Sequence, residues 1–313
     1  MERIDPNDLL FFAQVADSGS FRGAAERLNL PKSTLSRRIS QLEERLGERL
    51  LLRTTRRLTL TELGESVLAH ARQLGEEVDA VRALAEQRQA EPSGRLRVSM
   101  PGDFATQLLA NMLCEFVARH PGVWLELDLS PRRVDLLAEG FDLAVRTGVL
   151  EDDALLVARP LAVFEIGLYA APGYLTRAGC PQHPDELSRH LLLCLLSRGG
   201  ESSQWHLSTA GSTWTGQHGC RASANSPDIL IALAIAESGI AAIPECYAAA
   251  PLARGQLQRV LPNWTLPQQT AWAVFPGRRL MPIKTRRFID MLDAALRQTP
   301  GIRQKDPREA THP

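Results

Sequence analysis

The chain has 313 residues, of which 44% are hydrophobic and 23% are charged. A typical domain has roughly 100 to 200 residues, so we expect two or three domains with sizeable cores, and this composition excludes a chain that is disordered throughout. Uninterrupted apolar runs of about 18 residues do not occur, since even the segment 229–243 contains Glu237 and Gly239, so no membrane span is expected. The acidic N-terminus lacks the basic start and apolar run of a signal peptide, which favours a cytoplasmic protein.

Positive charge is concentrated in one segment of a neutral chain. The 36 basic and 36 acidic residues give a formal net charge of zero. Residues 20–57 nevertheless carry ten basic and four acidic side chains, a net charge of +6 that the remainder balances. Such a segment indicates local contact with a polyanion.

The cysteines favour reduced, mostly buried thiols over a disulfide framework. Their number is odd and no CxxC pair occurs, which also argues against a zinc site, so no metal is expected. A cysteine redox sensor is the alternative, and it would need two cysteines to approach each other and one thiol to have a lowered pKa. The cysteines are Cys114, Cys180, Cys194, Cys220 and Cys246.

The first 47 residues predict three short helices. Apolar residues recur at helical spacing over 5–18 and stop at Ser18-Gly19, and Ser20 is placed to cap a second helix that ends at Leu28. Pro31 fits the first turn of a third helix, which ends at Gly47. A short turn between the second and third helices is typical of a helix-turn-helix motif, whose second helix lies in the major groove of DNA.

Polar residues on the third helix are candidates for DNA contact, although a solvated amphipathic helix has the same pattern. Arg and Lys pair with guanine O6 and N7, and the start of a recognition helix lies deepest in the groove, so the base-edge candidates are Lys32, Ser33, Ser36 and Arg37. Residues 50–60 form two β-like runs around a basic turn, which predicts a wing. Contacts to phosphates or the minor groove are expected from Thr34, Arg38, Arg53, Arg56 and Arg57, and Ser20 is a further DNA-binding candidate. For Arg38, a salt bridge with Glu43 or Glu44 remains open.

A long helix is predicted over 62–89, with Thr61 as its cap. Apolar residues spaced alternately by four and three favour a coiled coil that joins two chains, and packing against the helix's own domain is the alternative. The residues of this stripe are Val67, Ala71, Leu74, Val78, Val81 and Ala85. Residues 91–94 then break the helix and are expected to form a hinge.

Beyond residue 95, strands and helices alternate, which predicts an α/β domain with a mostly parallel sheet. The expected strands are 96–100, 123–129, 141–146, 164–170, 191–196, 221–225, 240–243 and 271–275. The expected helices are 104–120, 133–139, 228–237 and 283–296. Residues 301–313 are expected to be a frayed polar tail.

Taken together, these stretches resemble the LysR-type transcriptional regulators over residues 4–298. The residues that match are 11–21, 24–28, 35–39 with 42–43, and 58–64 of the N-terminal part, and 141–146 with Gly148, 171–175 and 239–244 of the C-terminal part. The resemblance implies a winged helix-turn-helix domain (1–60), a dimerising linker helix (61–90) and a two-subdomain α/β effector-binding domain (95–300) like a periplasmic binding protein. It also implies a homodimer or homotetramer on promoter DNA. Subdomain I would span 95–161 and 266–300, and subdomain II 162–265.

In this architecture a ligand lies where strand C-termini meet helix N-termini, because unpaired N–H groups gather there. Arg146 or Arg198 could pair with a carboxylate of a small, polar or anionic effector. Asp103 is expected to be a helix N-cap, with a contact to the ligand as the alternative. The effector-binding candidates are Ser99, Met100, Pro101, Ser130, Arg146, Thr147, Ser197, Arg198, Asn225 and Ser226.

Two other classes of protein fit the sequence poorly. No GxSxG, GxxxxGK[ST] or HExxH motif occurs, and the histidines lack metal-like spacing, so an enzyme is not expected. A transport binding protein is disfavoured by the attached basic segment. The expected function is therefore a transcriptional regulator without a cofactor, whose partners are double-stranded promoter DNA, a second copy of itself, a small-molecule metabolite and, as a further possibility, RNA polymerase.

Overall fold

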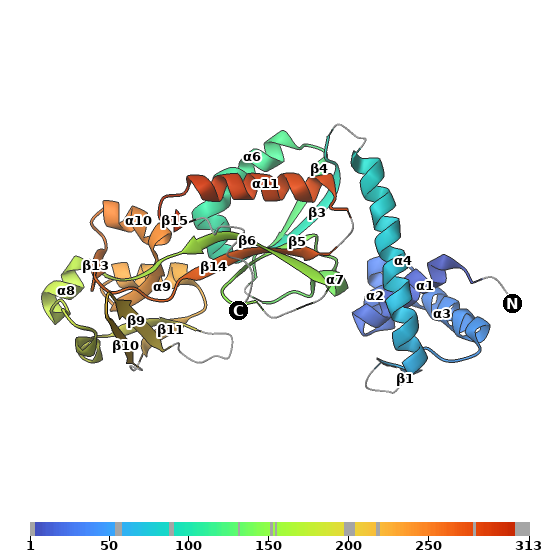
Figure 1. Ribbon diagram of the computed structural model, residues 1–313, viewed down its shortest axis with the longest axis horizontal. Coiled ribbons are helices and arrows are strands. Elements are labelled where there is room, and N and C mark those ends of the chain that lie inside the picture. Colours follow the sequence, from blue (N-terminus) through green and yellow to red (C-terminus); the bar gives the residue numbers. More distant parts are fainter. Residues whose placement is uncertain are drawn as a thin grey trace.

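The computed structural model describes residues 4–303 apart from 54–57, 88–90, 131, 151, 152, 154, 197–203, 217–219, 278 and 279. These residues form an N-terminal head, a long helix that leads out of it, and a domain of two lobes (Figure 1). Both helices and β-strands are present, as the sequence predicts.

The head consists of three helices and a two-stranded wing. Its helices are α1 (Pro6–Ser18), α2 (Phe21–Leu28) and α3 (Lys32–Leu46), and the wing pairs β1 (Leu51–Arg53) with β2 (Leu58–Leu60) in antiparallel register. Phe12, Val15, Leu35, Ile39 and Leu42 are fully buried in its core. The helix-turn-helix and the wing are therefore present as expected.

Local chemistry defines the boundaries of these helices. The Ser20 hydroxyl accepts a hydrogen bond from the Gly23 N–H at 3.0 Å and so caps α2. Asn29 ends α2 in the left-handed region with a φ of 51°. Pro31 precedes the helix as its N-cap residue, one position earlier than the sequence pattern indicates.

Helix α4 (Glu62–Gln87) leaves the head, and its first turns pack against α1. The Thr61 hydroxyl caps it by accepting from the Gly64 N–H at 2.9 Å. Gly64 is required here, because a Cβ atom would lie only 2.2 Å from the carbonyl oxygen of Leu50. Ala71 is fully buried in the core of the head, and Val67 packs against that core. Ala71 was therefore wrongly assigned to a seam between two chains.

Lobe I contains a six-stranded mixed sheet in the order β15-β6-β14-β5-β3-β4. Strand β3 pairs in parallel with β4 and β5, whereas β14 is antiparallel to β5 and β6. The strands are β3 (Gly94–Ser99), β4 (Val123–Asp128), β5 (Leu143–Thr147), β6 (Leu156–Phe164), β14 (Gln269–Pro276) and β15 (Ile302–Arg303). The strands expected at 96–100, 123–129 and 141–146 are parallel as predicted, but the sheet as a whole is mixed rather than mostly parallel, because β14 and β15 run in the opposite direction.

Helices cover both faces of this sheet. One face packs against α6 (Ala110–Arg119) and α11 (Ile283–Gln298), which lie side by side in Figure 1. The helix expected over 104–120 begins earlier, as α5 (Gly102–Phe104), and contains a π-helical segment, η1 (Ala105–Leu109), before α6. The short helix α7 (Leu136–Glu139) packs on the opposite face.

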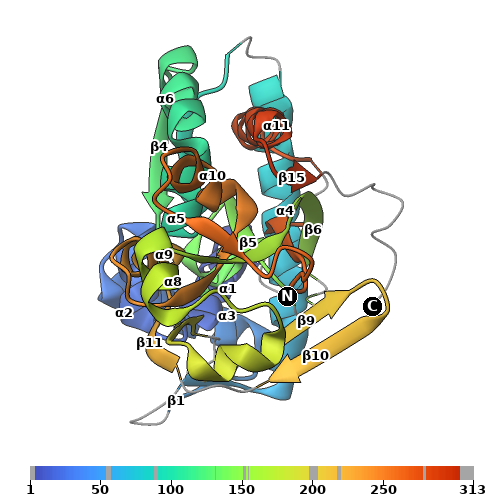
Figure 2. The same ribbon diagram turned by 90° about the vertical axis from the view of Figure 1, so that its left-hand side faces the viewer.

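Lobe II contains a five-stranded mixed sheet in the order β11-β8-β12-β7-β13 and a separate hairpin, seen to one side in Figure 2. The strands of the sheet are β7 (Ile166–Ala170), β8 (Leu192–Leu195), β11 (Cys220–Ala224), β12 (Ile240–Pro244) and β13 (Gln258–Val260). The hairpin pairs β9 (Trp205–Thr209) with β10 (Ser212–Gly216). The helices are α8 (Pro172–Ala178), the 3₁₀ helix η2 (Pro184–Arg189), α9 (Pro227–Ile235) and α10 (Glu245–Ala253).

The chain crosses between the lobes twice. Strand β6 belongs to lobe I up to Phe164 and β7 to lobe II from Ile166, so the first crossing is at Glu165, three residues later than predicted. The second lies between β13 and β14, at 261–268. The start of the expected tail is ordered, because Ile302 and Arg303 pair with β6.

Candidate functional site

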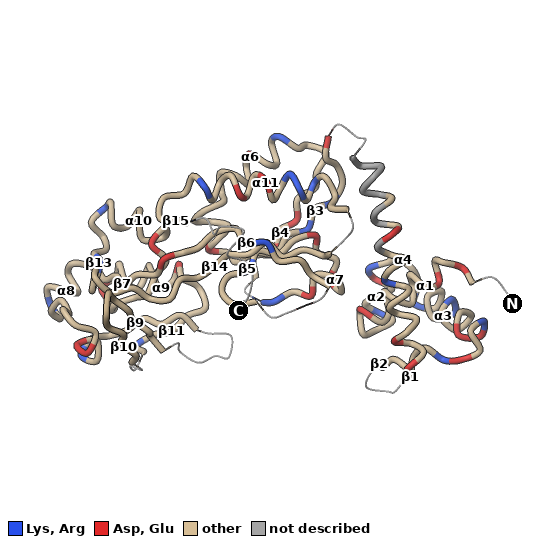
Figure 3. Tube along the Cα trace, viewed as in Figure 1, with Lys and Arg blue, Asp and Glu red and all other residues tan. Residues whose placement is uncertain are grey.

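The outer face of α3 presents polar and basic side chains. Lys32, Ser33 and Arg37 are exposed, whereas Thr34 and Ser36 are half-buried. Figure 3 marks Lys and Arg positions on α2 and α3 of the head. A basic helix surface beside a wing matches the geometry by which a recognition helix enters the major groove.

Arg38 has a different role from its neighbour Arg37. Its guanidinium pairs with Asp5 at 2.8 Å and with the buried carboxylate of Asp8 at 2.5 Å, and it lies over the Phe11 ring. A buried carboxylate needs a cation beside it, so Arg38 joins α3 to α1. The assignment of Arg38 to DNA phosphates is therefore corrected, and its partners are Asp8 of α1 and Asp5, the N-cap of that helix, rather than Glu43 or Glu44.

The remaining DNA-binding candidates are only partly described. Ser20 serves as the cap of α2. Arg53 lies in β1, while Arg56 and Arg57 lie outside the described residues. Glu43 holds the wing against α3, because its carboxylate accepts from the backbone N–H groups of Leu50 and Leu51 at 2.9 and 3.1 Å.

A cavity of about 650 Å³ lies between the two lobes. Both lobes contribute, since Phe164 of β6 and Ile166 of β7 line it together with residues 266–269 of the second crossing. Strand ends and helix starts meet at this place, as the solute-binding architecture predicts.

Six of the ten effector-binding candidates line this cavity: Pro101, Ser130, Arg146, Thr147, Asn225 and Ser226. Ser99 and Met100 do not line it, because both side chains are fully buried inside lobe I. Ser197 and Arg198 lie outside the described residues.

Arg146 is a buried cation on the cavity wall. It is 8% exposed, and its guanidinium donates to the Ser99 hydroxyl at 3.2 and 3.3 Å and to the Val145 carbonyl at 3.0 Å. Ser99 thus positions Arg146 on the cavity wall.

Several lining residues were missed by the sequence analysis. They come from segments beyond the expected strand ends: Arg132, Arg133, Gln204, Trp205, His206, Tyr247, Gln268 and Gln269. Tyr247 follows the end of β12, so the expectation that ligands bind at strand ends could have identified it. The hairpin residues have no feature in the local sequence that indicates a ligand site.

Two hydrogen bonds join the lobes beside the cavity. The Tyr247 hydroxyl donates to Asp103 at 3.0 Å, and the Gln107 amide donates to Asp228 at 2.9 Å. Asp103 is not the N-cap, which is Pro101; it lines the cavity instead. Burial raises the pKa of Asp103, partly offset by the hydrogen bond from Tyr247.

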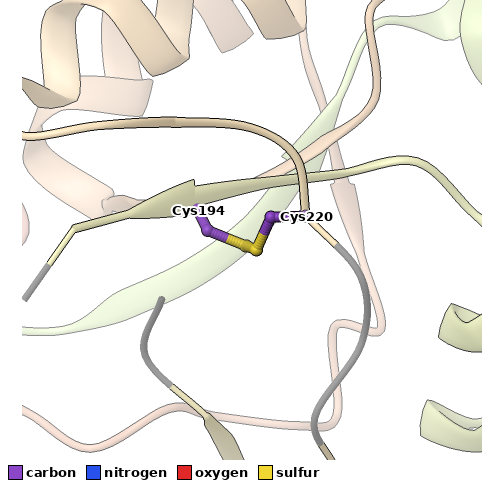
Figure 4. Close-up of a disulfide and its surroundings, with 2 residues drawn as sticks. All are labelled: Cys194 and Cys220. Atoms are coloured by element: carbon purple, nitrogen blue, oxygen red, sulfur yellow. A yellow bond between two sulfur atoms is a disulfide. The ribbon is translucent and has the colours of Figure 1, made fainter. Parts of the chain in front are cut away.

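Cys194 and Cys220 form a disulfide between β8 and the start of β11 (Figure 4). The expectation that these two cysteines are reduced is therefore corrected. Twenty-six residues separate them in sequence, and parallel pairing of their strands brings the Cα atoms to 5.9 Å. Cys114, Cys180 and Cys246 have free thiols, and burial raises the pKa of the Cys246 thiol to about 12.

Among the described residues, no group of three or more His, Cys, Asp or Glu side chains is placed to hold a metal ion. In the same part of the chain, no helix is both long and apolar enough to cross a membrane.

A winged helix-turn-helix head joined to a two-lobed domain with a cavity between its lobes defines a ligand-responsive DNA-binding regulator. Family models agree with this division: a LysR substrate binding domain matches residues 89–297, and a bacterial regulatory helix-turn-helix protein of the lysR family matches residues 6–65.

Individual relatives cover nearly the whole chain. An HTH-type transcriptional regulator of Xanthomonas campestris is 37% identical over 291 residues, which are 92% of this chain and 84% of the relative. The HTH-type transcriptional regulator PtxR of Pseudomonas aeruginosa is 35% identical and covers 96% of both chains. The solved structure of CrgA, a LysR-type regulator from Neisseria meningitidis, has a TM-score of 0.60 at 30% identity, over 93% of this chain and 99% of CrgA. The chain belongs to the LysR family of transcriptional regulators.

Proposed function

We propose that this regulator works in the cytoplasm and binds promoter DNA through α3 and the wing, under the control of a small polar metabolite held between the lobes. The observation that carries the proposal is the cavity of about 650 Å³, whose wall combines Arg146, Thr147 and Asn225 with apolar side chains. Cavities of this size and lining are typical of small-molecule sites. We propose no catalytic activity and no cofactor, and the relatives are named as transcriptional regulators.

Binding in the cavity is tested by a thermal-shift screen of metabolites on the full chain, followed by calorimetry. A ligand that stabilises the wild type should bind Thr147→Val more weakly, because the variant lacks the hydroxyl on the cavity wall. Thr213→Val is the matched control, since Thr213 is exposed on the hairpin outside the cavity. Equal affinity for all three proteins would place the ligand elsewhere.

We further propose that the regulator acts as a homodimer or homotetramer. The stripe on α4 continues beyond the head: Leu74 and Val78 are half-buried and Val81 is 64% exposed. Apolar side chains at this spacing suit a helix pair. RNA polymerase is the further partner that a promoter-bound regulator would contact.

A redox-responsive regulator is the second candidate, and the Cys194–Cys220 disulfide favours it. Thiols in the cytoplasm are normally kept reduced, so in a cytoplasmic regulator this disulfide would form only under oxidising conditions. Under this candidate, peroxide and dithiothreitol should shift DNA affinity in opposite directions for the wild type. Cys194→Ser should abolish the response, whereas Cys180→Ser should retain it. If affinity is the same in the oxidised and reduced states, this candidate fails.

A further inference from the structure

Cations predominate among the charged side chains that line the cavity. Among the described lining residues, the cations are Arg132, Arg133 and Arg146, and the one carboxylate is that of Asp103. Asp103 is already engaged by the Tyr247 hydroxyl. The cavity therefore has the charge that an anionic ligand requires.

Arg132 connects this cavity to helix α7. Its two terminal nitrogens donate to the two carboxylate oxygens of Glu139 at 2.8 and 2.6 Å, and one of them also donates to Asp128 at 3.0 Å. The Arg132 side chain is 52% exposed. Exposed ion pairs contribute little net stability, so Arg132 can exchange one carboxylate partner for another.

The carboxylate of Glu139 is held in place by more than Arg132. It accepts from the backbone N–H of Asp135 at 3.1 Å, and the Glu139 carbonyl accepts from Arg97. If Arg132 moves away from Glu139, the Glu139 carboxylate stays at the end of α7 without the cation that neutralises it.

Helix α7 contacts the head at α1. The hydrogen bond from Arg132 is the main cause that lowers the pKa of Glu139, and the positive charge of Arg27 on α2 lowers it further. Arg27 in turn donates to the Ser18 hydroxyl at the end of α1, at 3.0 Å. The ion pair with Arg132 and the contact of α7 with α1 thus place Glu139 between an arginine of the cavity and the head, where Arg27 is bonded to the end of α1.

We propose that the cavity's ligand carries an anionic group, a carboxylate or a phosphate, that takes Arg132 from Glu139, and that Glu139 then attracts Arg27 and tightens the existing contact between the head and α7. This inference rests on the proposed function, because it assumes that the ligand occupies the cavity between the lobes. It assigns the ligand's charge and a route by which its binding reaches the DNA-binding head.

The test measures amide hydrogen exchange of α2 and α7 in the full chain, with inorganic phosphate or acetate as the probe and chloride as the balancing salt. Either anion should slow exchange in both helices of the wild type, on the order of twofold to fivefold. Arg132→Gln should show the slow exchange without any anion, because Glu139 has already lost its partner. For Arg27→Gln, calorimetry should still detect binding of the anion. Adding the anion should no longer slow amide exchange in α2 of this variant.

Arg22→Gln is the matched control on α2, since Arg22 is exposed and pairs with Glu26 on its own helix. It should behave as the wild type. The inference is overturned if neither anion binds, if Arg132→Gln exchanges like the wild type, or if Arg27→Gln retains the response. If one of these results is found and a metabolite nevertheless binds the wild type more tightly than Thr147→Val, the proposed function still holds. Failure of this inference can therefore be distinguished from failure of the proposed function.

Discussion

Arg37 and Arg38 are adjacent on α3, and the structure gives them separate roles. Arg37 is exposed on the polar face, whereas Arg38 pairs with Asp5 and Asp8 of α1. Arg37→Ala should therefore weaken binding to the specific sequence by about 1 to 3 kcal/mol while leaving the stability of the head unchanged. Fluorescence anisotropy on specific and scrambled duplexes measures the first quantity, and thermal unfolding the second.

Arg38→Ala serves as the comparison. It should lower the free energy of unfolding by about 1 to 3 kcal/mol, because it leaves the buried Asp8 carboxylate with fewer partners. If Arg38→Ala lost sequence discrimination at unchanged stability, its assignment to the interior of the head would be wrong.

Asp103 predicts a pH-dependent stability. Burial raises its pKa above the ordinary value of 3.8, so folding favours the protonated form and the folded state loses stability as pH rises through the raised pKa. Asp103→Asn keeps an oxygen acceptor for Tyr247 and removes the charge. The variant should have a higher melting temperature than the wild type near pH 7, and the difference should vanish below pH 3.8.

Asp290→Asn, an exposed position on α11, is the control and should show no such trend. A melting temperature of Asp103→Asn that is below the wild type at neutral pH would show that the charged form stabilises the fold.

At the scale of elements, α4 divides into a part that packs on its own head and a part that leaves it. Ala71 belongs to the head, whereas Val81 is 64% exposed. Replacing Val78 and Val81 with Asp should dissociate the oligomer, because two charges would enter the seam. Analytical ultracentrifugation of the full chain measures this, with Glu77→Gln, an exposed residue of the same helix, as the control. If the wild type sediments as a monomer, the proposal that α4 pairs with its copy in a second chain is wrong.

Helical and strand periodicity predicted most of the elements, and the exceptions have physical reasons. Strand β6 was missed because Pro160 lies in its middle, and the structure accommodates this proline where the register with β14 shifts. Helix α10 was missed because it has Pro251 in its interior and little polar patterning. The hairpin β9–β10 packs through Trp205 and Leu207 against lobe II, a contact that the local sequence does not reveal.

The sequence predicted those residues of the cavity wall that lie at the ends of strands. Pro101, Ser130 and Arg146 are such residues. Ser99 and Met100 were wrong because the last residue of β3 and the residue after it are still enclosed by the core of lobe I. Trp205 reaches the cavity from the hairpin, and the Cys194–Cys220 pairing depends on strand neighbours, so both required the three-dimensional fold.

For the whole molecule, the chain joins the two lobes at two crossings, and the cavity lies between these lobes. A ligand that binds one arrangement of the lobes better shifts the protein toward it, and α4 and α7 both connect that domain to the head. The central claim is therefore that occupancy of the cavity changes affinity for DNA.

The measurement that tests this claim most directly is the dissociation constant of the full chain for a DNA fragment selected from genomic sequence, determined by fluorescence anisotropy with and without a cavity ligand. We expect a change of about 5- to 150-fold, the usual range of coupling between two sites. We also expect this change to be lost in Thr147→Val at ligand concentrations that saturate only the wild type. Identical dissociation constants, with calorimetry showing the ligand bound to the wild type, would contradict the claim.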